Sequence, residues 1–224
     1  MAACQFLEGV LNAAELTAIR DGLSNASFTS GLSTNPNAAT IKHNLQAQPD
    51  DAARRLGLQV QQALFRHPQF GPATLPKRSS EPFFARYEAG MFYRDHIDEP
   101  LLRGQVTLRT DLSCTVFISE PDTYKGGELL IGREPDRTCV KLAAGDAVIY
   151  PSDSVHQITE VTGGIRIVAL CWLESLVREH ERRQILYQLD MALADVMGNA
   201  KASDDSALAL AQARSNLIRM WADT

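Results

Sequence analysis

The spacing of apolar side chains changes twice along the chain, from helical to alternating and back to helical. Apolar residues recur at helical spacing over residues 13–23, after Asn12, and over residues 51–66, after Asp50. Asparagine and aspartate are frequent helix N-caps, so this pattern predicts two helices. Between them, residues 24–44 are rich in Ser, Thr, Asn and Gly, which indicates turns or edge strands.

The central part of the chain alternates short apolar runs with turn residues such as Gly126-Gly127 and Thr162-Gly163-Gly164. Short runs rich in β-branched and aromatic residues are typical of strands. Because no helical pattern separates them, they favour an antiparallel sandwich or barrel over a parallel sheet. The seven predicted strands are residues 83–87, 113–118, 128–131, 138–142, 147–150, 155–161 and 165–172.

Helical spacing returns after Glu174 and ends at Gly198-Asn199. A second helical pattern follows Ser203, a candidate N-cap, and reaches Trp221. We therefore expect a mainly β protein with flanking helices, of the α+β class, whose last two helices form an antiparallel hairpin on the β domain. The predicted division is 1–80 for N-terminal helices and loops packed on the core, 81–175 for the core, and 176–224 for the C-terminal helical hairpin.

Composition narrows the class of protein without identifying it. The 27 acidic and 22 basic residues give a net charge of −5, which argues against a nucleic-acid or anionic-membrane surface. The longest apolar run, residues 167–173, is too short to cross a bilayer. Residues 1–8 carry no basic side chain and lack the apolar stretch of a secretory signal. The four cysteines form no CxxC pair, so we expect free thiols and a cytoplasmic location.

One pair of residues has the spacing of metal ligands. His96 and Asp98 are two residues apart, which on a strand places both side chains on one face and turns Ile97 to the other. An imidazole beside a carboxylate makes two-thirds of a two-histidine, one-carboxylate metal site. Alone, the tripeptide is equally compatible with a histidine–aspartate contact at a sheet edge. Three further histidines are expected to be solvated surface residues: His43, His67 and His180.

A third ligand and a carboxylate-binding residue are offered by a later segment. His156 begins a predicted hairpin that pairs residues 155–158 with 165–168, and taken singly it is also compatible with a structural strand-end histidine. Arg166 follows ten residues later, inside an apolar segment. A buried guanidinium needs a carboxylate, and this hairpin offers no obvious buried acid. A ligand carboxylate would satisfy it; the alternative is an arginine that reaches water from an edge strand.

Together these residues resemble the iron(II)/2-oxoglutarate-dependent dioxygenases. Residues 87–98, YEAGMFYRDHID, are similar to the prolyl-4-hydroxylase-type strand that leads into the iron ligands. Three later segments resemble the next strands of the same enzymes: residues 109–117 (RTDLSCTVF), 124–129 (YKGGEL) and 141–152 (KLAAGDAVIYPS). With the helical tail, the whole resembles the bacterial PKHD-type hydroxylases. The resemblance extends from about Phe6 and is most specific between Phe83 and Arg178.

The resemblance implies a double-stranded β-helix, or jelly roll, and a set of site residues. The implied iron(II) ligands are His96, Asp98 and His156, and Arg166 holds the distal carboxylate of 2-oxoglutarate. Prolyl-hydroxylase relatives often have lysine at this last position, and either side chain can hold a carboxylate. Tyr87 is similar to a tyrosine that lines the co-substrate pocket, and it is equally compatible with simple packing inside the barrel.

The implied enzyme hydroxylates a C–H substrate, a small molecule or a peptide, and releases succinate and CO2, with ascorbate as a further cofactor. Its exact substrate and its oligomeric state are not predicted. The alternative is a cupin-like metal-binding jelly roll without oxygenase activity, either an isomerase or an iron-responsive binding protein. Arg166 distinguishes the two, because a non-oxygenase has no evident need to bind a carboxylate there. The complete three-ligand set disfavours a non-catalytic interaction module.

Overall fold

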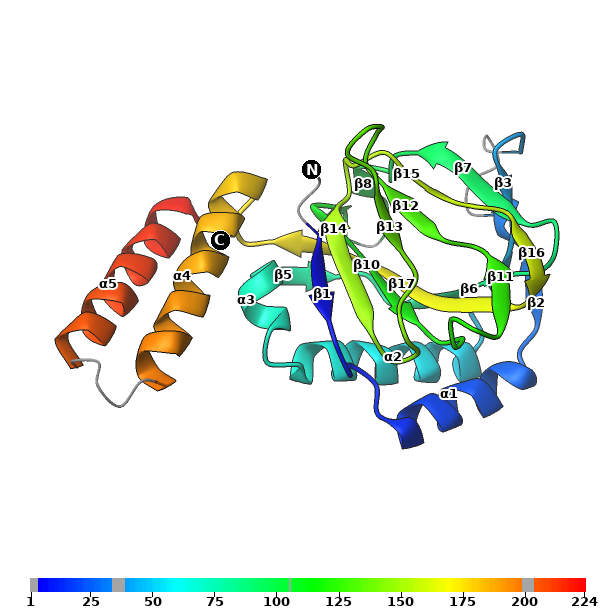
Figure 1. Cartoon of the computed structure of the whole chain (residues 1–224), viewed down its shortest axis with the longest axis horizontal. Coiled ribbons are helices and arrows are strands. Elements are labelled where there is room, and N and C mark those ends of the chain that lie inside the picture. The colour runs from blue at the N-terminus through cyan, green and yellow to red at the C-terminus, as the bar shows by residue number, and fades with distance from the viewer. Residues whose placement is uncertain (1–3, 34–38, 105, 199–203) are drawn as a thin grey trace.

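The computed structural model describes residues 4–33, 39–104, 106–198 and 204–224. Two antiparallel β-sheets face each other, two helices cover the outer face of the larger sheet, and two more stand beside the β-structure (Figure 1). Facing antiparallel sheets of this kind form a jelly roll. The predicted class, mainly β with flanking helices, is confirmed.

Among the described residues the larger sheet has eight strands. In spatial order they are β1 (Gln5–Leu7), β14 (Ala147–Pro151), β10 (Leu112–Phe117), β17 (Arg166–Ser175), β6 (Phe83–Tyr87), β4 (Leu45–Ala47) and β2 (Phe28–Ser30), with β5 (Pro76–Ser79) also paired to β17. The longest strand, β17, is central, with β10 along one side and β6 and β5 along the other. Its first residue, Arg166, therefore lies inside the sheet, opposite Tyr87.

The smaller sheet supplies the other wall of the barrel. Its strands, in order, are β13 (Thr138–Val140), β12 (Leu129–Ile131), β15 (His156–Ile158), β7 (Phe92–His96) and β3 (Lys42–His43). The register of β15 on β7 places His156 opposite His96. Two ribbons complete the β-structure: β11 (Tyr124–Gly126) with β16 (Val161–Gly164), and β8 (Leu101–Leu102) with β9 (Leu108–Arg109).

The two N-terminal helices begin where the sequence predicts. The Asn12 side chain accepts a hydrogen bond from the backbone N–H of Glu15, and the Glu15 carboxylate accepts one from Asn12, before α1 (Ala13–Ser24). Asp50 caps α2 (Asp51–Arg66) by accepting from the backbone N–H of Ala53. Two short elements are not predicted by the pattern. One is a 3-10 turn at Gly31–Ser33, after α1, and the other is the helix α3 (Phe70–Thr74), after α2.

Two apolar layers hold the sheets in place. Ile19 of α1 and Val60 of α2 belong to a cluster packed on the outer face of the larger sheet. A second cluster fills the space between the sheets, with Phe117 and Val168 from the larger sheet and Leu129 from the smaller one. The candidate site occupies one end of this inner layer, so its residues project from a closely packed frame.

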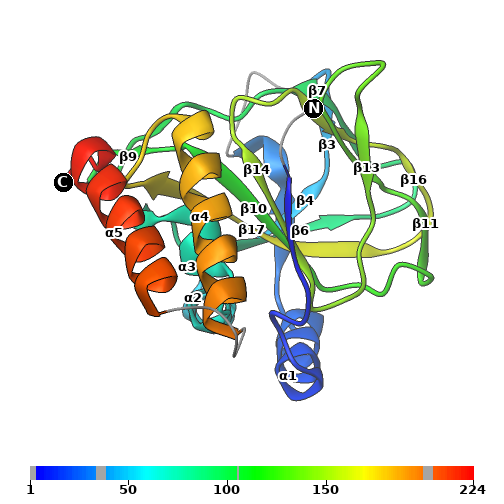
Figure 2. The same ribbon diagram turned by 60° about the vertical axis from the view of Figure 1, so that its left-hand side comes forward.

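Two long helices, α4 (His180–Gly198) and α5 (Asp204–Trp221), lie side by side next to the barrel (Figures 1 and 2). Leu186 of α4 packs with Leu75 and Val177, and Trp221 of α5 packs against them. The predicted helical hairpin is confirmed, whereas Asn199 and the candidate cap Ser203 lie outside the described residues. The division of the chain at residues 80 and 175 stays a prediction. Within the described ranges, no helix has the length and hydropathy to cross a membrane.

The predicted hairpin between residues 155–158 and 165–168 is wrong. Residues 155–161 form parts of two strands, β15 in the smaller sheet and β16 in a separate ribbon, and Arg166 begins β17 in the larger sheet. The chain leaves the smaller sheet at Thr159, where the backbone N–H and the hydroxyl both bond to Glu128. The other six predicted strands are β6, β10, β12, β13, β14 and β17, with ends shifted by at most three residues.

Candidate active site

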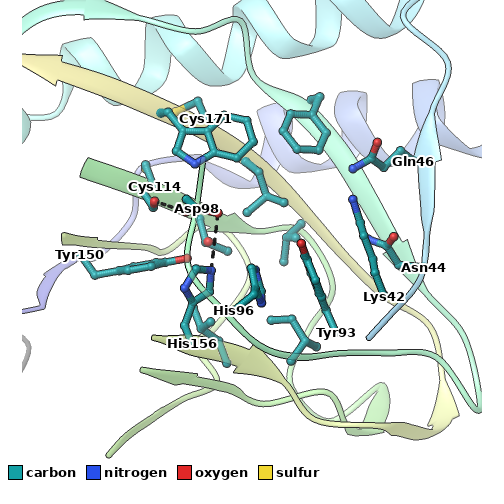
Figure 3. Close-up of a pocket in the computed structure, with 18 of the residues that line it drawn as sticks. Lys42, Asn44, Gln46, Tyr93, His96, Asp98, Cys114, Tyr150, His156 and Cys171 are labelled. Carbon is teal, nitrogen blue, oxygen red and sulfur yellow. Dashed lines mark hydrogen bonds and ion pairs between the residues drawn. The ribbon is translucent and has the colours of Figure 1, made fainter. Parts of the chain in front are cut away.

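A cavity of about 340 Å³ lies between the two sheets. It receives polar and titratable side chains from both sheets (Figure 3). A cavity with a few convergent polar groups is the usual form of an active site. All five residues that the sequence singles out line it: Tyr87, His96, Asp98, His156 and Arg166.

The His-x-Asp pair and the distant histidine come together. One candidate ligand atom from each of His96, Asp98 and His156 lies within 4.8 Å of the others, and Asp98 Oδ1 is 3.8 Å from His156 Nε2. Strand β7 ends at His96, so the prediction that His96 and Asp98 share a strand is wrong, and Asp98 lies two residues beyond its end. Its side chain still points toward His156 (Figure 3). The next residue, Glu99, is exposed and stands outside this cluster.

Backbone carbonyls orient both imidazoles. The Nδ1 atom of His96 lies 2.8 Å from the carbonyl oxygen of Arg94, and that of His156 lies 2.9 Å from the carbonyl oxygen of Ser154. An Nδ1–H that donates to a carbonyl leaves Nε2 unprotonated and available to a metal. Two imidazoles and one carboxylate arranged in this way can bind one face of an octahedral ion.

The carboxylate of Asp98 is held by the opposite sheet. The Ser113 hydroxyl of β10 donates to Asp98 Oδ2 and lies 2.8 Å from the hydroxyl of Ser152. The backbone N–H of Asp98 donates to the carbonyl of Ser152 at 3.2 Å. Both serines are buried. Residue spacing alone does not reveal them, because their relation to Asp98 exists only after the two sheets pack.

Tyr93 completes the surroundings of His96. The two rings are stacked, with centroids 3.5 Å apart and planes 12° from parallel. Burial, joined by the neighbouring His156, lowers the pKa of His96 to about 4, while Asp98 opposes the shift. The ring is therefore neutral at physiological pH, which is the form that binds a metal.

Arg166 is the largest fully buried side chain of the described residues, with 1% of its surface exposed. Within the described residues, none of its three guanidinium nitrogens has a hydrogen-bond partner. Its Cζ atom lies 5.2 Å from the ring centroid of Tyr87 and 5.6 Å from that of Phe117. Cation–π contacts offset part of the desolvation cost, but a buried guanidinium normally binds a carboxylate. The alternative of an arginine that reaches water from an edge strand is wrong, because β17 is central.

Tyr124 is a neighbour of Arg166 that sequence reasoning does not identify. Its hydroxyl is buried and has no hydrogen-bond partner among the described residues. Burial raises the pKa of Tyr124, and the charge of Arg166 opposes the shift. Gly127, at a φ of +68°, makes room for both residues, because a Cβ there would lie 3.0 Å from Arg166 Cδ and 3.3 Å from Tyr124 Cε2. Steric crowding by Arg166 and Tyr124 therefore explains why glycine occupies position 127 of this turn.

A row of polar residues on the N-terminal strands also lines the cavity: Lys42, Asn44 and Gln46. The pattern predicts this segment as a turn or edge strand, so it does not reveal these side chains as part of a site. Burial raises the pKa of Tyr87 to about 12, while the charge of Arg166 and the neighbouring Asn44 oppose the shift. Tyr87 therefore packs inside the barrel and also lines the cavity.

Comparison with known proteins places the chain. The family described as the 2OG-Fe(II) oxygenase superfamily matches residues 82–174, and the PKHD-type hydroxylase C-terminal domain matches residues 181–223. A PKHD-type hydroxylase of Caulobacter sp. (strain K31) is 42% identical over 219 residues, which are 96% of each chain. The chain belongs to the PKHD-type hydroxylase family. The PKHD-type hydroxylase of Hyphomonas neptunium is 41% identical, again over 96% of each chain.

The fold of this hydroxylase is shared with solved relatives. A crystal structure of a Pseudomonas putida prolyl-4-hydroxylase superposes with a TM-score of 0.54 at 19% identity, over 78% of this chain and 94% of that one. Membership of the PKHD family makes the protein an iron(II)- and 2-oxoglutarate-dependent dioxygenase, which hydroxylates a C–H substrate and releases succinate and CO2. The cupin-like alternative has no support from these relatives.

Proposed function

We propose that His96, Asp98 and His156 hold the catalytic iron(II) of this hydroxylase and that Arg166 holds the distal carboxylate of 2-oxoglutarate. The observation that carries the proposal is the buried guanidinium of Arg166, which has no hydrogen-bond partner among the described residues and lines the same cavity as the three candidate ligands. A bidentate carboxylate is the ligand that a guanidinium fits best.

The protein's part in the reaction is to bind, orient and shield the reactants. Bound iron(II) and 2-oxoglutarate supply the oxidising power for hydroxylation. The neutral His96 ring and the Asp98 carboxylate, held by Ser113, offer two oriented metal donors. Arg166 and Tyr87, at the inner end of the cavity, fix the far end of the co-substrate. Positioning of this kind removes much of the entropic cost of bringing the reactants together.

The same proposal includes ascorbate as the reductant that maintains the iron, a small-molecule or peptide substrate, and a cytoplasmic location. The role of ascorbate is checked by the number of turnovers with and without it, and the location by cell fractionation.

The proposed site is tested by adding iron(II) and 2-oxoglutarate anaerobically to the purified protein. We expect the visible charge-transfer absorption band of the chelated co-substrate, and its absence would contradict the proposed site.

We expect Ser113→Ala to weaken iron(II) binding by roughly 10- to 100-fold, the usual effect of losing a hydrogen bond that orients a metal ligand. The variant removes the donor to Asp98 Oδ2 and leaves all three candidate ligands in place. A metal titration of the anaerobic protein measures the change. Ser206→Ala, on α5, is the matched control. Equal affinity in Ser113→Ala and the native protein would contradict a role for this hydroxyl in positioning Asp98.

We further expect Tyr124→Phe to raise the 2-oxoglutarate concentration at half-saturation by about 3- to 10-fold, the effect of one neutral hydrogen bond. The reason is that its hydroxyl, beside Arg166, is available to the same carboxylate. Titration of the charge-transfer band measures this. Tyr187→Phe, on α4, should leave the titration unchanged. If Tyr124→Phe also leaves it unchanged, the hydroxyl does not contact the co-substrate.

A further inference from the structure

The central strand β17 leads from the closed end of the cavity to its open end. Alternate residues of a strand point to the same side, and four such residues of β17 line the cavity: Arg166, Val168, Leu170 and Trp172. The first two are each 1% exposed, whereas the last two are only half-buried. The cavity is therefore accessible from the end that Trp172 lines, and Arg166 closes the opposite end.

Trp172 stands at the level of the candidate metal ligands. In the larger sheet it pairs with Ser113, whose hydroxyl donates to Asp98. Paired residues of neighbouring strands project to the same face, so the indole ring lies in the same row of the cavity as Ser113. The inference drawn from this position rests on the proposed function. With iron at Asp98 and 2-oxoglutarate reaching back to Arg166, the space beside Trp172 is left for the primary substrate.

This outer part of the cavity has an aromatic surface. The rings of Phe83 and Trp172 are stacked, with centroids 5.5 Å apart and planes 26° from parallel, and both residues line the cavity. Phe83 belongs to β6 and pairs with Leu170, so its ring reaches Trp172 diagonally across the two strands. Exposed Ile97 lines the cavity as well. The open end therefore offers a flat aromatic surface with an aliphatic neighbour.

The alternative for these two rings is a purely structural role, as core residues that cover each other. Neither Phe83 nor Trp172 belongs to any of the three apolar clusters found among the described residues. Both rings also stay half-buried in spite of their stacking. Large aromatic side chains that are left partly uncovered inside a cavity are typical of a ligand-binding surface.

The main chain holds the aromatic surface in a fixed position. The backbone N–H of Trp172 donates to the hydroxyl of Ser80, and the carbonyl of Trp172 accepts from the backbone N–H of Ser80, both at 2.9 Å. The strand that carries the ring is also paired on both sides. A ring supported in this way loses little freedom when a ligand binds, which favours affinity.

We infer that the primary substrate of this hydroxylase carries an aromatic ring, which stacks on the surface made by Phe83 and Trp172. Trp172 is then the specificity-determining residue. Because Trp172 shares a row with Ser113, the stacked ring or a group attached to it lies beside Asp98. Aromatic pairs attract each other beyond the effect of the area they bury, which corresponds to about 2- to 10-fold in affinity.

The test uses two neutral probes with the same carbon skeleton, phenylacetamide and cyclohexylacetamide. The saturated ring is the bulkier and more apolar of the two, so hydrophobicity alone would favour cyclohexylacetamide. The protein is loaded with Zn(II), which is redox-inert, and with saturating 2-oxoglutarate. Loading is verified first by the rise in melting temperature that 2-oxoglutarate causes. Saturation-transfer NMR then gives the dissociation constant of each probe.

The variants compared with the native protein are Trp172→Leu, Trp172→Phe and Phe65→Leu. Phe65 is a half-exposed ring on α2, outside the cavity lining, and serves as the matched control. Fluorescence then locates the bound probe, because the chain has two tryptophans and the other, Trp221, packs beside the C-terminal helices. Trp221→Phe leaves Trp172 as the sole tryptophan, and Trp172→Phe leaves Trp221.

We expect the native protein and Phe65→Leu to bind phenylacetamide about 2- to 10-fold more tightly than cyclohexylacetamide. Trp172→Leu should lose this preference and still bind cyclohexylacetamide, which also shows that the variant is folded. Trp172→Phe should keep the preference. Phenylacetamide should change the tryptophan emission of Trp221→Phe and leave that of Trp172→Phe unchanged.

The inference would be overturned by equal or absent binding of the two probes, by a preference that survives Trp172→Leu, or by an unchanged emission of Trp221→Phe. The emission test does not require Trp172→Leu to fold. Failure of 2-oxoglutarate to stabilise the native protein would instead count against the proposed function.

Discussion

His96→Ala, Asp98→Ala and His156→Ala should each abolish tight iron(II) binding and turnover. Each variant removes one of three donors that lie within 4.8 Å of one another, and within the described residues no other His, Cys, Asp or Glu joins the cluster. Loss of a hydrogen bond that merely orients a ligand costs about 10- to 100-fold in metal affinity, so loss of the ligand itself should cost more. Anaerobic metal titration and succinate formation measure the two effects.

Glu99→Ala is the matched control for this experiment. It removes a carboxylate one residue from Asp98, but its side chain is exposed and outside the cluster, so iron affinity should be nearly unchanged. Normal activity in any folded alanine variant of the three would remove that residue from the ligand set. A loss of iron binding in Glu99→Ala but not in Asp98→Ala would mean that the acid is misassigned by one position.

Arg166→Ala should leave iron(II) affinity nearly intact and raise the 2-oxoglutarate requirement by roughly 30- to several-thousand-fold. Removal of one side of a buried charge-assisted pair typically costs about 2–5 kcal/mol, which corresponds to that range. The guanidinium is buried and has no hydrogen-bond partner among the described residues, so no protein carboxylate is left unpaired by the substitution. The measurement is the half-saturation of the charge-transfer band, or of succinate formation, by 2-oxoglutarate.

Two further variants make the Arg166 experiment specific. Arg166→Lys should lose less than Arg166→Ala, because an ammonium keeps the attraction but gives up the two-pronged contact. Arg94→Ala removes an exposed arginine two residues before His96 and should leave the titration unchanged. If half-saturation is the same in Arg166→Ala as in the native protein, Arg166 does not bind the co-substrate.

Residue types and spacing singled out His96, Asp98, His156 and Arg166, and the family resemblance added Tyr87 and the role of each residue. His96, Asp98, His156, Arg166 and Tyr87 all line one cavity, although their roles stay a proposal until tested. The two N-caps, Asn12 and Asp50, were predictable for a local reason, since a cap is decided within four residues. The C-terminal helices follow from an apolar stripe of helical period in the same way.

Sequence reasoning was wrong where the answer depends on which strands become neighbours. No glycine or proline interrupts residues 155–161, so the sequence cannot show that the chain changes partner at Thr159 and that His156 and Arg166 belong to different sheets. Ser113, Tyr124 and Lys42 were missed for a related reason. A buried polar residue and an exposed one look alike in a sequence, and only packing assigns Ser113 and Lys42 to the cavity and Tyr124 to the side of Arg166.

The central position of β17 determines when during synthesis this enzyme can become functional. Until residues 166–175 have left the ribosome, β10 and β6 both present unpaired edges where β17 belongs, and the cavity lacks its buried cation. Strand β1 also lacks its partner until late in synthesis, because Gln5 pairs with Ile149 of β14. Exposed strand edges favour association with other chains, so a stalled or truncated product is exposed to aggregation before it can hold a co-substrate. Such non-local pairing also slows folding, which makes this hydroxylase a candidate for chaperone protection while it is made.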